Sequence, residues 1–288
     1  MAEKKSSFLS SLTAWQDGLL VDLLAIVFLL FLGLLYLFPF FGQADQGNVF
    51  SAPLIPLLSH SLTLLANLTK GQAVTLVLLV FLILSPIFVY FFTTSLVGRR
   101  LSGFVSALVY SLPTELFLKS RIKMALLIGD GGHIVALALV PVAALLLLTF
   151  LRRGKFYALI LGGLTLGLMA LASPFGLLVG LITLTIIAFS EFLLGQGRLK
   201  ILRFTIFIVL AIGLVAFWYD PAFLSLFLKS QQGQAIRKTF FNLVPLSFVV
   251  VPVLGAFGFL LFEKRTNLQP LFIALGLVVL FSLISFAS

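Results

Sequence analysis

Ionisable residues are scarce in this sequence, and those that gather in one place attract attention first. The densest group lies in the range 113–133 and comprises Glu115, Lys119, Arg121, Lys123, Asp130 and His133. Such a group beside apolar segments favours a functional site, because charges next to lipid are costly. The cations Lys119, Arg121 and Lys123 could neutralise a phosphate or pyrophosphate at the membrane interface.

Asp130 and His133 lie on the glycine-rich turn 129–133 and could bind a divalent cation. A carboxylate oxygen and an imidazole nitrogen suit Mn²⁺ or Zn²⁺, whereas Mg²⁺ needs only one or two carboxylates plus substrate oxygens. Since two ligands are few, we rank phosphate contact above a preformed Mg²⁺ or Mn²⁺ site. The alternative is that the cations snorkel from an interfacial helix while Asp130 and His133 cap the next helix.

Asp45 lies in a polar patch, residues 42–48, directly after the first long apolar segment. The range 49–68 follows, in which Ser59 and His60 belong to a set of polar residues that alternate with leucines. This pattern predicts an amphipathic helix along the membrane surface. We hypothesise that Asp45 is the principal catalytic carboxylate; the alternative is a solvated turn or cap formed by Asp45 and Asn48.

A third polar stretch, 219–243, begins with Asp220-Pro221 and carries Lys229, Arg237 and Lys238. Proline is favoured in the first turn of a helix, so Asp220 is interpreted as a helix start and not as a catalytic acid. The apolar and basic residues after it predict a further interfacial segment. Asp17, Asp22, Glu191 and Glu263 lie near the ends of apolar segments and are interpreted as interface charges.

The elements that position these residues are membrane helices. Hydrophobic residues make up 61% of the chain, charged residues 10%, and the mean hydropathy is +1.23. A soluble globule of 288 residues could not be covered by so little polar surface. The apolar runs lack the alternation of barrel strands, so they predict an all-α polytopic membrane protein with about nine transmembrane helices. The expected segments are 18–41, 73–97, 101–112, 134–151, 156–172, 175–194, 201–218, 244–262 and 271–286.

Basic residues set the expected orientation, since short loops rich in Lys and Arg stay cytoplasmic. They crowd the tight turns at 99–100, 152–155 and 198–203, so these turns and the N-terminus are predicted to be cytoplasmic. The longer segments 42–71, 113–133 and 219–243 are then external. Since 101–112 is too short to span alone, the range 113–128 either extends it or lies in the interface, and we favour the interface.

The composition also excludes several classes of function. The net charge of +10 is explained by cytoplasmic loops beside anionic lipid head groups, and it does not indicate nucleic-acid binding. The absence of cysteine excludes disulfides, a thiolate nucleophile and cysteine metal sites. The range 1–288 is expected to form a single membrane domain, either as the whole protein or as the N-terminal part of a longer one.

Taken together, the arrangement resembles the GT-C superfamily of membrane glycosyltransferases. Asp45, Arg99-Arg100, the turn 129–133 and the segment 219–243 fall where that family has its first-loop aspartate, a tight cytoplasmic turn and later external segments. Further similarity to uncharacterised bacterial and archaeal GT-C-like proteins lies at Pro141, Arg152-Arg153, Leu161-Gly162-Gly163 and Ala172-Ser173-Pro174. Two features depart from the family: Asp45 has no acidic neighbour, and no external C-terminal domain follows.

The resemblance implies transfer of a sugar from a polyprenyl-phosphate or pyrophosphate donor to an unknown acceptor on the external face. Asp45 would be the base or would organise a metal, and the acids and cations of 113–133 would surround the donor phosphate. The alternative is a non-catalytic membrane protein, a transporter or lipid-handling scaffold with sites between helices near mid-membrane. The short segments 101–112 and 156–172 are the kind of interruption that transporters use.

Overall fold

The computed structural model describes the whole chain except residues 1, 42, 44–51, 265 and 288. The described residues form helices and connecting turns, with no strand among them, which confirms the predicted all-α class. The chain divides into two compact units. The first contains residues 1–49 and 55–134, and the second contains 50–54 and 135–288. That they act as one membrane domain stays a prediction.

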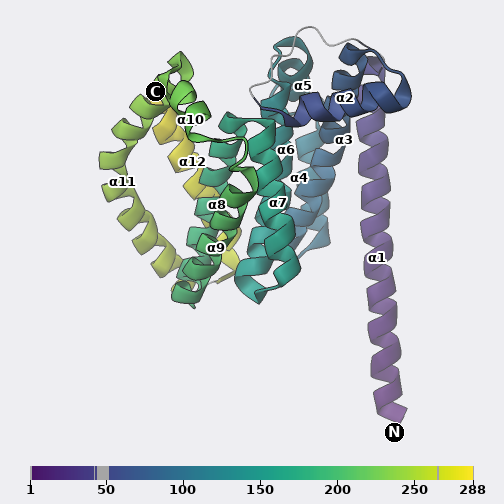
Figure 1. The fold of residues 1–288 in the computed structure, drawn as a ribbon. Helices are drawn as coiled ribbons and strands as arrows, with labels where there is room; N and C mark the ends of the chain where they lie inside the picture. Colours follow the sequence, from purple (N-terminus) through teal and green to yellow (C-terminus); the bar gives the residue numbers. More distant parts are fainter. Residues whose placement is uncertain (1, 42, 44–51, 265, 288) are drawn as a thin grey trace. The chain divides into compact units, whose positions relative to one another are not determined.

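The helices follow one another with short connections (Figure 1). The first unit contains α1 (Ala2–Leu37), the 3-10 helix η1 (Phe38–Phe40), α2 (Leu54–Ala66), α3 (Lys70–Val97), α4 (Arg100–Ser111), α5 (Leu118–Ile122) and the π-helix η2 (Lys123–Leu127). Helix α6 (Gly131–Arg153) begins in the first unit and continues in the second. The second unit also contains α7 (Phe156–Ala172), α8 (Pro174–Leu193), α9 (Gly197–Val215), α10 (Pro221–Lys229), α11 (Gln231–Lys264), η3 (Thr266–Leu268) and α12 (Gln269–Ala287).

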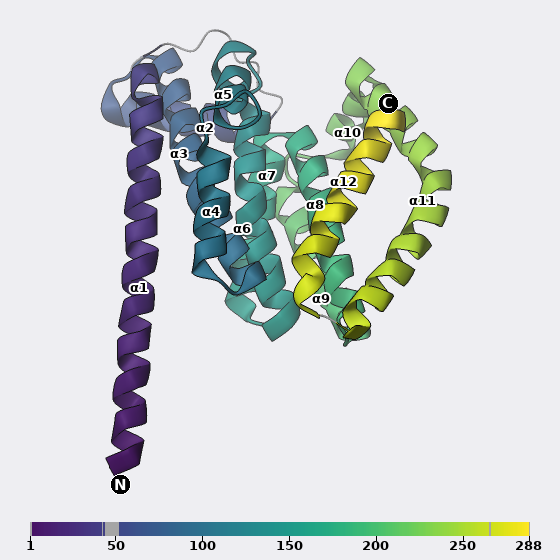
Figure 2. The ribbon, with the colours of Figure 1, turned by 180° about the vertical axis from the view of Figure 1, so that it is seen from behind.

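The core of the first unit forms where α1, α3 and α4 pack side by side, as Figures 1 and 2 both show. Its buried residues are Ala25 and Leu29 of α1, Ile87 and Tyr90 of α3, and Ala107 of α4. Helices α3 and α4 approach closely because α4 carries a glycine at position 103, where a Cβ would lie 2.7 Å from the Tyr90 carbonyl oxygen. This contact holds the two helices in the tight turn predicted at 99–100.

Helix α2 forms inside the predicted amphipathic range 49–68. Its exposed residues include Leu57, Leu64 and Leu65, and its buried residues are Ile55 and Ser59. Ser59 was expected among the polar residues of the amphipathic helix, but it is only 1% exposed, and its hydroxyl donates to the Pro56 carbonyl oxygen at 3.0 Å. Exposed leucines along a short helix indicate a surface that lies against lipid.

Glycines also set the packing of the second unit. At Gly162 on α7, a Cβ would lie 2.3 Å from the ring of Phe207 on α9, and at Gly163 one would lie 2.8 Å from Leu210. Phe207 is fully buried as a result. Small residues that let two helices approach closely are a common basis of helix association in membranes.

Helix α11 begins earlier than the sequence predicted. It runs without interruption from Gln231 to Lys264, so the boundary expected at 243–244 lies inside a helix. Pro245 and Pro252 lie within it. The helix curves along its length in Figures 1 and 2, and prolines inside a helix are a usual cause of bending, since each removes one backbone hydrogen bond.

All nine expected segments fall on helices, but these helices differ in length and charge. Five stretches are long and apolar enough to cross a membrane: Gly18–Phe40, Lys70–Val97, Gly131–Arg153, Pro174–Leu193 and Thr266–Ser285. Helix α4 has only 12 residues, which at about 1.5 Å per residue gives roughly 18 Å. The described helices therefore support a membrane protein with five candidate spans.

Candidate functional site

The predicted phosphate-binding cations lie on the short helices α5 and η2, between α4 and α6. Lys119 pairs with Glu115, with Lys119 Nζ 2.6 Å from Glu115 Oε1, and both side chains are about two-thirds exposed. Lys119 holds the pKa of Glu115 below its usual range, and Lys123 contributes to the same shift. Lys123 is itself exposed. Lys119 and Lys123 are thus available at the surface near one carboxylate.

Arg121 points the other way and is largely buried. Its Nη1 donates to Ser85 Oγ of α3 at 3.1 Å, its Nε donates to the Phe117 carbonyl oxygen at 3.3 Å, and its Nη2 donates to the Tyr110 carbonyl oxygen. The guanidinium carbon also lies 3.6 Å from the centre of the Tyr110 ring. Burial lowers the pKa of Arg121. These contacts tie α5 to α3 and α4, so Arg121 does not lie beside Lys119 and Lys123.

Asp130 and His133 do come together, at the start of α6. The Asp130 carboxylate accepts a hydrogen bond from the His133 backbone N–H, which is the geometry of a helix cap. Burial raises the pKa of Asp130, and the neighbouring His133 opposes that shift. The His133 side-chain Nδ1 is buried and has no hydrogen-bond partner among the described residues. The alternative interpretation, a helix cap, is therefore confirmed for Asp130, and the buried imidazole nitrogen of His133 has no hydrogen-bond partner among the described residues.

The metal prediction rests on these two residues. Within the described ranges, no group of three or more His, Cys, Asp or Glu side chains could hold a metal ion. Asp130 and His133 supply one oxygen and one nitrogen, so Mg²⁺ or Mn²⁺ bound there would take its remaining ligands from substrate or water. Asp45 lies outside the described residues, and its closeness to Asp130 stays a prediction.

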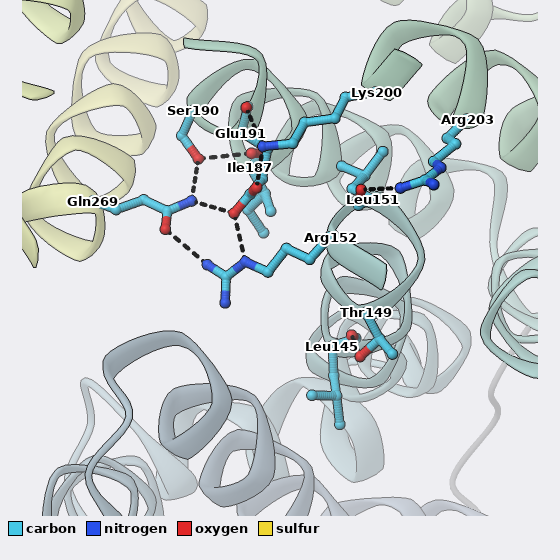
Figure 3. A network of polar contacts seen from close by, with 10 residues as sticks. All are labelled: Leu145, Thr149, Leu151, Arg152, Ile187, Ser190, Glu191, Lys200, Arg203 and Gln269. Carbon is cyan, nitrogen blue, oxygen red and sulfur yellow. Dashed lines mark hydrogen bonds and ion pairs between the residues drawn. The ribbon is translucent and has the colours of Figure 1, made fainter. Parts of the chain in front are cut away.

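The most extensive polar cluster in the second unit was not predicted. Glu191 near the end of α8 is only 1% exposed. Its Oε1 accepts from Arg152 Nε of α6 at 2.8 Å and from Gln269 Nε2 of α12 at 2.8 Å, while its Oε2 accepts from Lys200 Nζ of α9 at 2.9 Å. Figure 3 shows these three side chains converging on the carboxylate of α8 from three other helices. Glu191 is therefore a buried ion-pair partner, and its position at the membrane interface stays a prediction.

Further hydrogen bonds close this cluster, which we call the Glu191 network (Arg152, Ser190, Glu191, Lys200 and Gln269). The Gln269 side chain donates to Ser190 Oγ at 3.0 Å and accepts from Arg152 Nη2 at 2.8 Å, and Lys200 Nζ also donates to the Glu191 carbonyl oxygen at 2.8 Å. The sequence did contain a signal for this cluster. Glu191 lies near the end of an apolar segment, and two other apolar segments carry Arg152 and Lys200 at the ends that lie near it. The network joins helix ends, and both oxygens of its carboxylate accept hydrogen bonds.

A smaller polar cluster in the first unit includes another acid interpreted as an interface charge. Asp22 of α1 accepts from Arg100 Nε at 2.9 Å and from the Tyr90 hydroxyl. A cavity of about 670 Å³ opens beside Tyr90 and Arg100 and is otherwise lined by apolar side chains of α1 and α4, such as Phe28 and Phe104. The cavity combines an apolar wall with one polar end, where Arg100 is paired with Asp22.

The geometry thus separates the expected site into parts. Glu115, Lys119 and Lys123 form an exposed charged surface, Asp130 and His133 form a helix cap beside a buried, unpartnered nitrogen, and Arg121 packs against α3 and α4. Comparison of this chain with protein-family models, curated proteins and solved structures finds no match.

Proposed function

We propose that this chain is a GT-C-like membrane glycosyltransferase that transfers a sugar from a polyprenyl-phosphate-linked donor on the external face. Nine membrane segments would carry three external stretches, 42–71, 113–133 and 219–243. The observation that carries the proposal is the pairing of Asp130 with His133 at the start of α6, with the His133 Nδ1 buried and unpartnered among the described residues. A transferase needs such groups on the external side of its membrane helices.

The chemistry of sugar transfer fits these residue types. A base must take the proton of the acceptor, and positive charge must stabilise the departing phosphate. Asp45 is the proposed base, and Lys119 and Lys123 are exposed cations in the same external stretch as Asp130 and His133. A divalent cation on Asp130 and His133 would add charge at the phosphate.

Transfer is tested directly in membranes that contain the protein. A polyprenyl-phosphate donor with a radiolabelled sugar is added, and the label leaving the lipid phase is counted. Asp45→Asn and Asp130→Asn should each lower the rate about 100-fold or more, as loss of a catalytic acid or base does. Glu263→Gln, a matched change at an exposed carboxylate of α11, should leave it unchanged. Full activity of Asp45→Asn would exclude its catalytic role.

The nine-segment arrangement has its own test, since the chain contains no native cysteine. Single cysteines at Leu116 and Ser230 should react with an impermeant maleimide added from outside, whereas cysteines at Lys155 and Asn267 should react only after permeabilisation. All four positions are exposed. Labelling of any position from the opposite side would show that the segment count is wrong.

The cavity between α1 and α4 favours a second candidate, a lipid-handling protein without catalysis. Its apolar lining suits a lipid chain. The two candidates differ in one measurement. An enzyme consumes the labelled donor, whereas a lipid-handling protein binds or moves it and leaves the sugar attached.

A further inference from the structure

A second group of cations lies in the other unit, where α10 meets α11. The side chains of Lys229, Gln234, Arg237, Lys238, Phe241 and Asn242 line a pocket of about 520 Å³, which we call the basic pocket. No acidic residue lines it, and no carboxylate of the described residues pairs with its three cations. Its volume lies within the range of about 300 to 1,000 Å³ typical of small-molecule sites.

Local structure holds the walls of this pocket in place. The Ser230 hydroxyl accepts the Gly233 N–H at 3.1 Å, and the Gln234 side chain donates to the Lys229 carbonyl oxygen at 3.0 Å. A Cβ at Gly233 would lie 2.0 Å from the Phe227 carbonyl oxygen, so only glycine allows the first turn of α11 to lie this close to α10. The Arg237 guanidinium lies 5.8 Å from the centre of the Phe241 ring. These contacts fix the junction of α10 and α11, and its three cations line the same pocket.

The one acid of this segment is already engaged at the opposite end of α10. Asp220 Oδ1 accepts the Phe223 N–H at 2.6 Å and caps the helix, which confirms the predicted helix start. The range 219–243 has no other acid. Positive charge at the basic pocket is therefore not compensated within its own segment.

The surface beside the pocket points to lipid. Phe227 of α10 packs against Phe175 of α8, with ring centres 6.0 Å apart, so this face of α10 lies on the helix bundle. On α10, Leu224, Leu226 and Leu228 remain 43%, 70% and 49% exposed. A short helix with leucines exposed along it and cations at its end suits the boundary between acyl chains and head groups.

We propose that the basic pocket binds the phosphate of an anionic phospholipid head group. The three cations donate charge-assisted hydrogen bonds to the phosphate oxygens, and the exposed leucines of α10 contact the acyl chains. The basic pocket contains none of the proposed transferase residues, and the proposal of lipid binding does not depend on sugar transfer.

Lipid binding to the full chain tests the proposal. The protein is purified in a neutral detergent and titrated with phosphatidylglycerol or phosphatidylcholine, and bound lipid is counted by native mass spectrometry. We expect one phosphatidylglycerol to bind with at least tenfold preference. Arg237→Gln/Lys238→Gln should lower that affinity about fivefold for each charge removed, about 25-fold together. Both side chains are exposed, so this variant should fold.

The matched control is Arg153→Gln/Lys155→Gln, which removes the same charge from exposed positions in the turn between α6 and α7. It should keep the affinity of the parent protein. Gly233→Ala keeps every cation but displaces α11 from α10, and it should weaken binding in the same direction. An equal loss of affinity in both charge variants would mean general electrostatic attraction and would overturn the proposal.

Two further results would also overturn it. Equal binding of phosphatidylcholine and phosphatidylglycerol would show that the net charge of the head group is not recognised. Displacement of phosphatidylglycerol by an equal concentration of inorganic phosphate would identify a site for free phosphate instead of lipid. Displacement only at large excess would support the assignment to lipid, because the acyl chains would then add to the phosphate contact.

Discussion

Replacing Glu191 by glutamine should destabilise the second unit more than any other single change of one carboxylate in the described chain. The substitution keeps the size of the side chain and one neutral acceptor oxygen, and it removes the charge shared by Arg152 and Lys200. The side chain of Lys200 is only 11% exposed, whereas that of Arg152 is 34% exposed. Lys200 would therefore keep a buried charge without a carboxylate.

The size of the effect follows from these exposures. Removing one partner of a buried ion pair costs about 3–5 kcal/mol. We take the lower end for Lys200, because its Nζ keeps the Glu191 carbonyl oxygen at 2.8 Å. Arg152 is screened by solvent and adds about 0.5 kcal/mol or less. The expected loss is about 3 kcal/mol, or roughly 6–12 °C in the apparent Tm at about 2–4 °C per kcal/mol.

The assay is thermal loss of the monodisperse size-exclusion peak of the detergent-solubilised protein. Glu263→Gln is the control, since Glu263 is exposed and its substitution should change the free energy of unfolding by about 0.5 kcal/mol or less. A second variant, Glu191→Gln/Lys200→Met, removes the buried cation as well and should regain about 2 kcal/mol, a coupling within the range seen for contacting residues.

The reasoning fails if Glu191→Gln shifts the apparent Tm by less than about 2 °C, which is under the shift for 1 kcal/mol. It also fails if the double variant is less stable than the single one. Either result would mean that Lys200 and Arg152 find enough solvent without the carboxylate, and that the Glu191 network does not hold the helix ends together.

Other changes separate packing from binding. Arg121→Gln should lower the free energy of unfolding by about 2–3 kcal/mol through lost charge-assisted hydrogen bonds, whereas Lys119→Gln should leave the Tm unchanged and, if the donor binds there, raise the KM of the transfer assay. Burial raises the pKa of Asp130, so its contribution to stability is complete below the unfolded pKa near 4 and is lost as pH rises through the folded pKa. Asp130→Asn should therefore remove part of the fall in Tm between pH 4 and 7, and an unchanged pH profile would contradict this. Gly162→Val should cost about 1–3 kcal/mol by displacing Phe207, measured by the same thermal assay, while Gly213→Val, with open space around it, should cost less than Gly162→Val.

Much of the fold followed from the sequence, because a helix in lipid needs a long apolar run and such runs are visible in one dimension. The predicted range 156–172 coincides with α7. Helix α11 was predicted too short, because its first turns carry cations and glutamines. Such polar residues indicate where a helix leaves the apolar layer, and the helix itself can continue through them. Composition therefore located the segments better than it located their ends.

Side-chain directions were harder to predict. Arg121 and Lys119 are two residues apart in one basic run, yet the first is buried against Tyr110 and the second is exposed. The difference depends on where α3 and α4 lie, which no local pattern contains. Glu191 was missed for the same reason, because its partners come from helices 9 to 78 residues away along the chain.

The shortness of α4 has a consequence for the membrane itself. In the nine-segment arrangement proposed above, α4 would be a helix of about 18 Å in a hydrocarbon core of roughly 30 Å, a mismatch of about 12 Å that neighbouring lipids would relieve by thinning locally. The chain reaches Glu115 within a few residues of the end of α4, so its polar segment would begin below the level of the surrounding head groups. Bilayers of longer-chain lipids should then raise the cost of the thinning around α4.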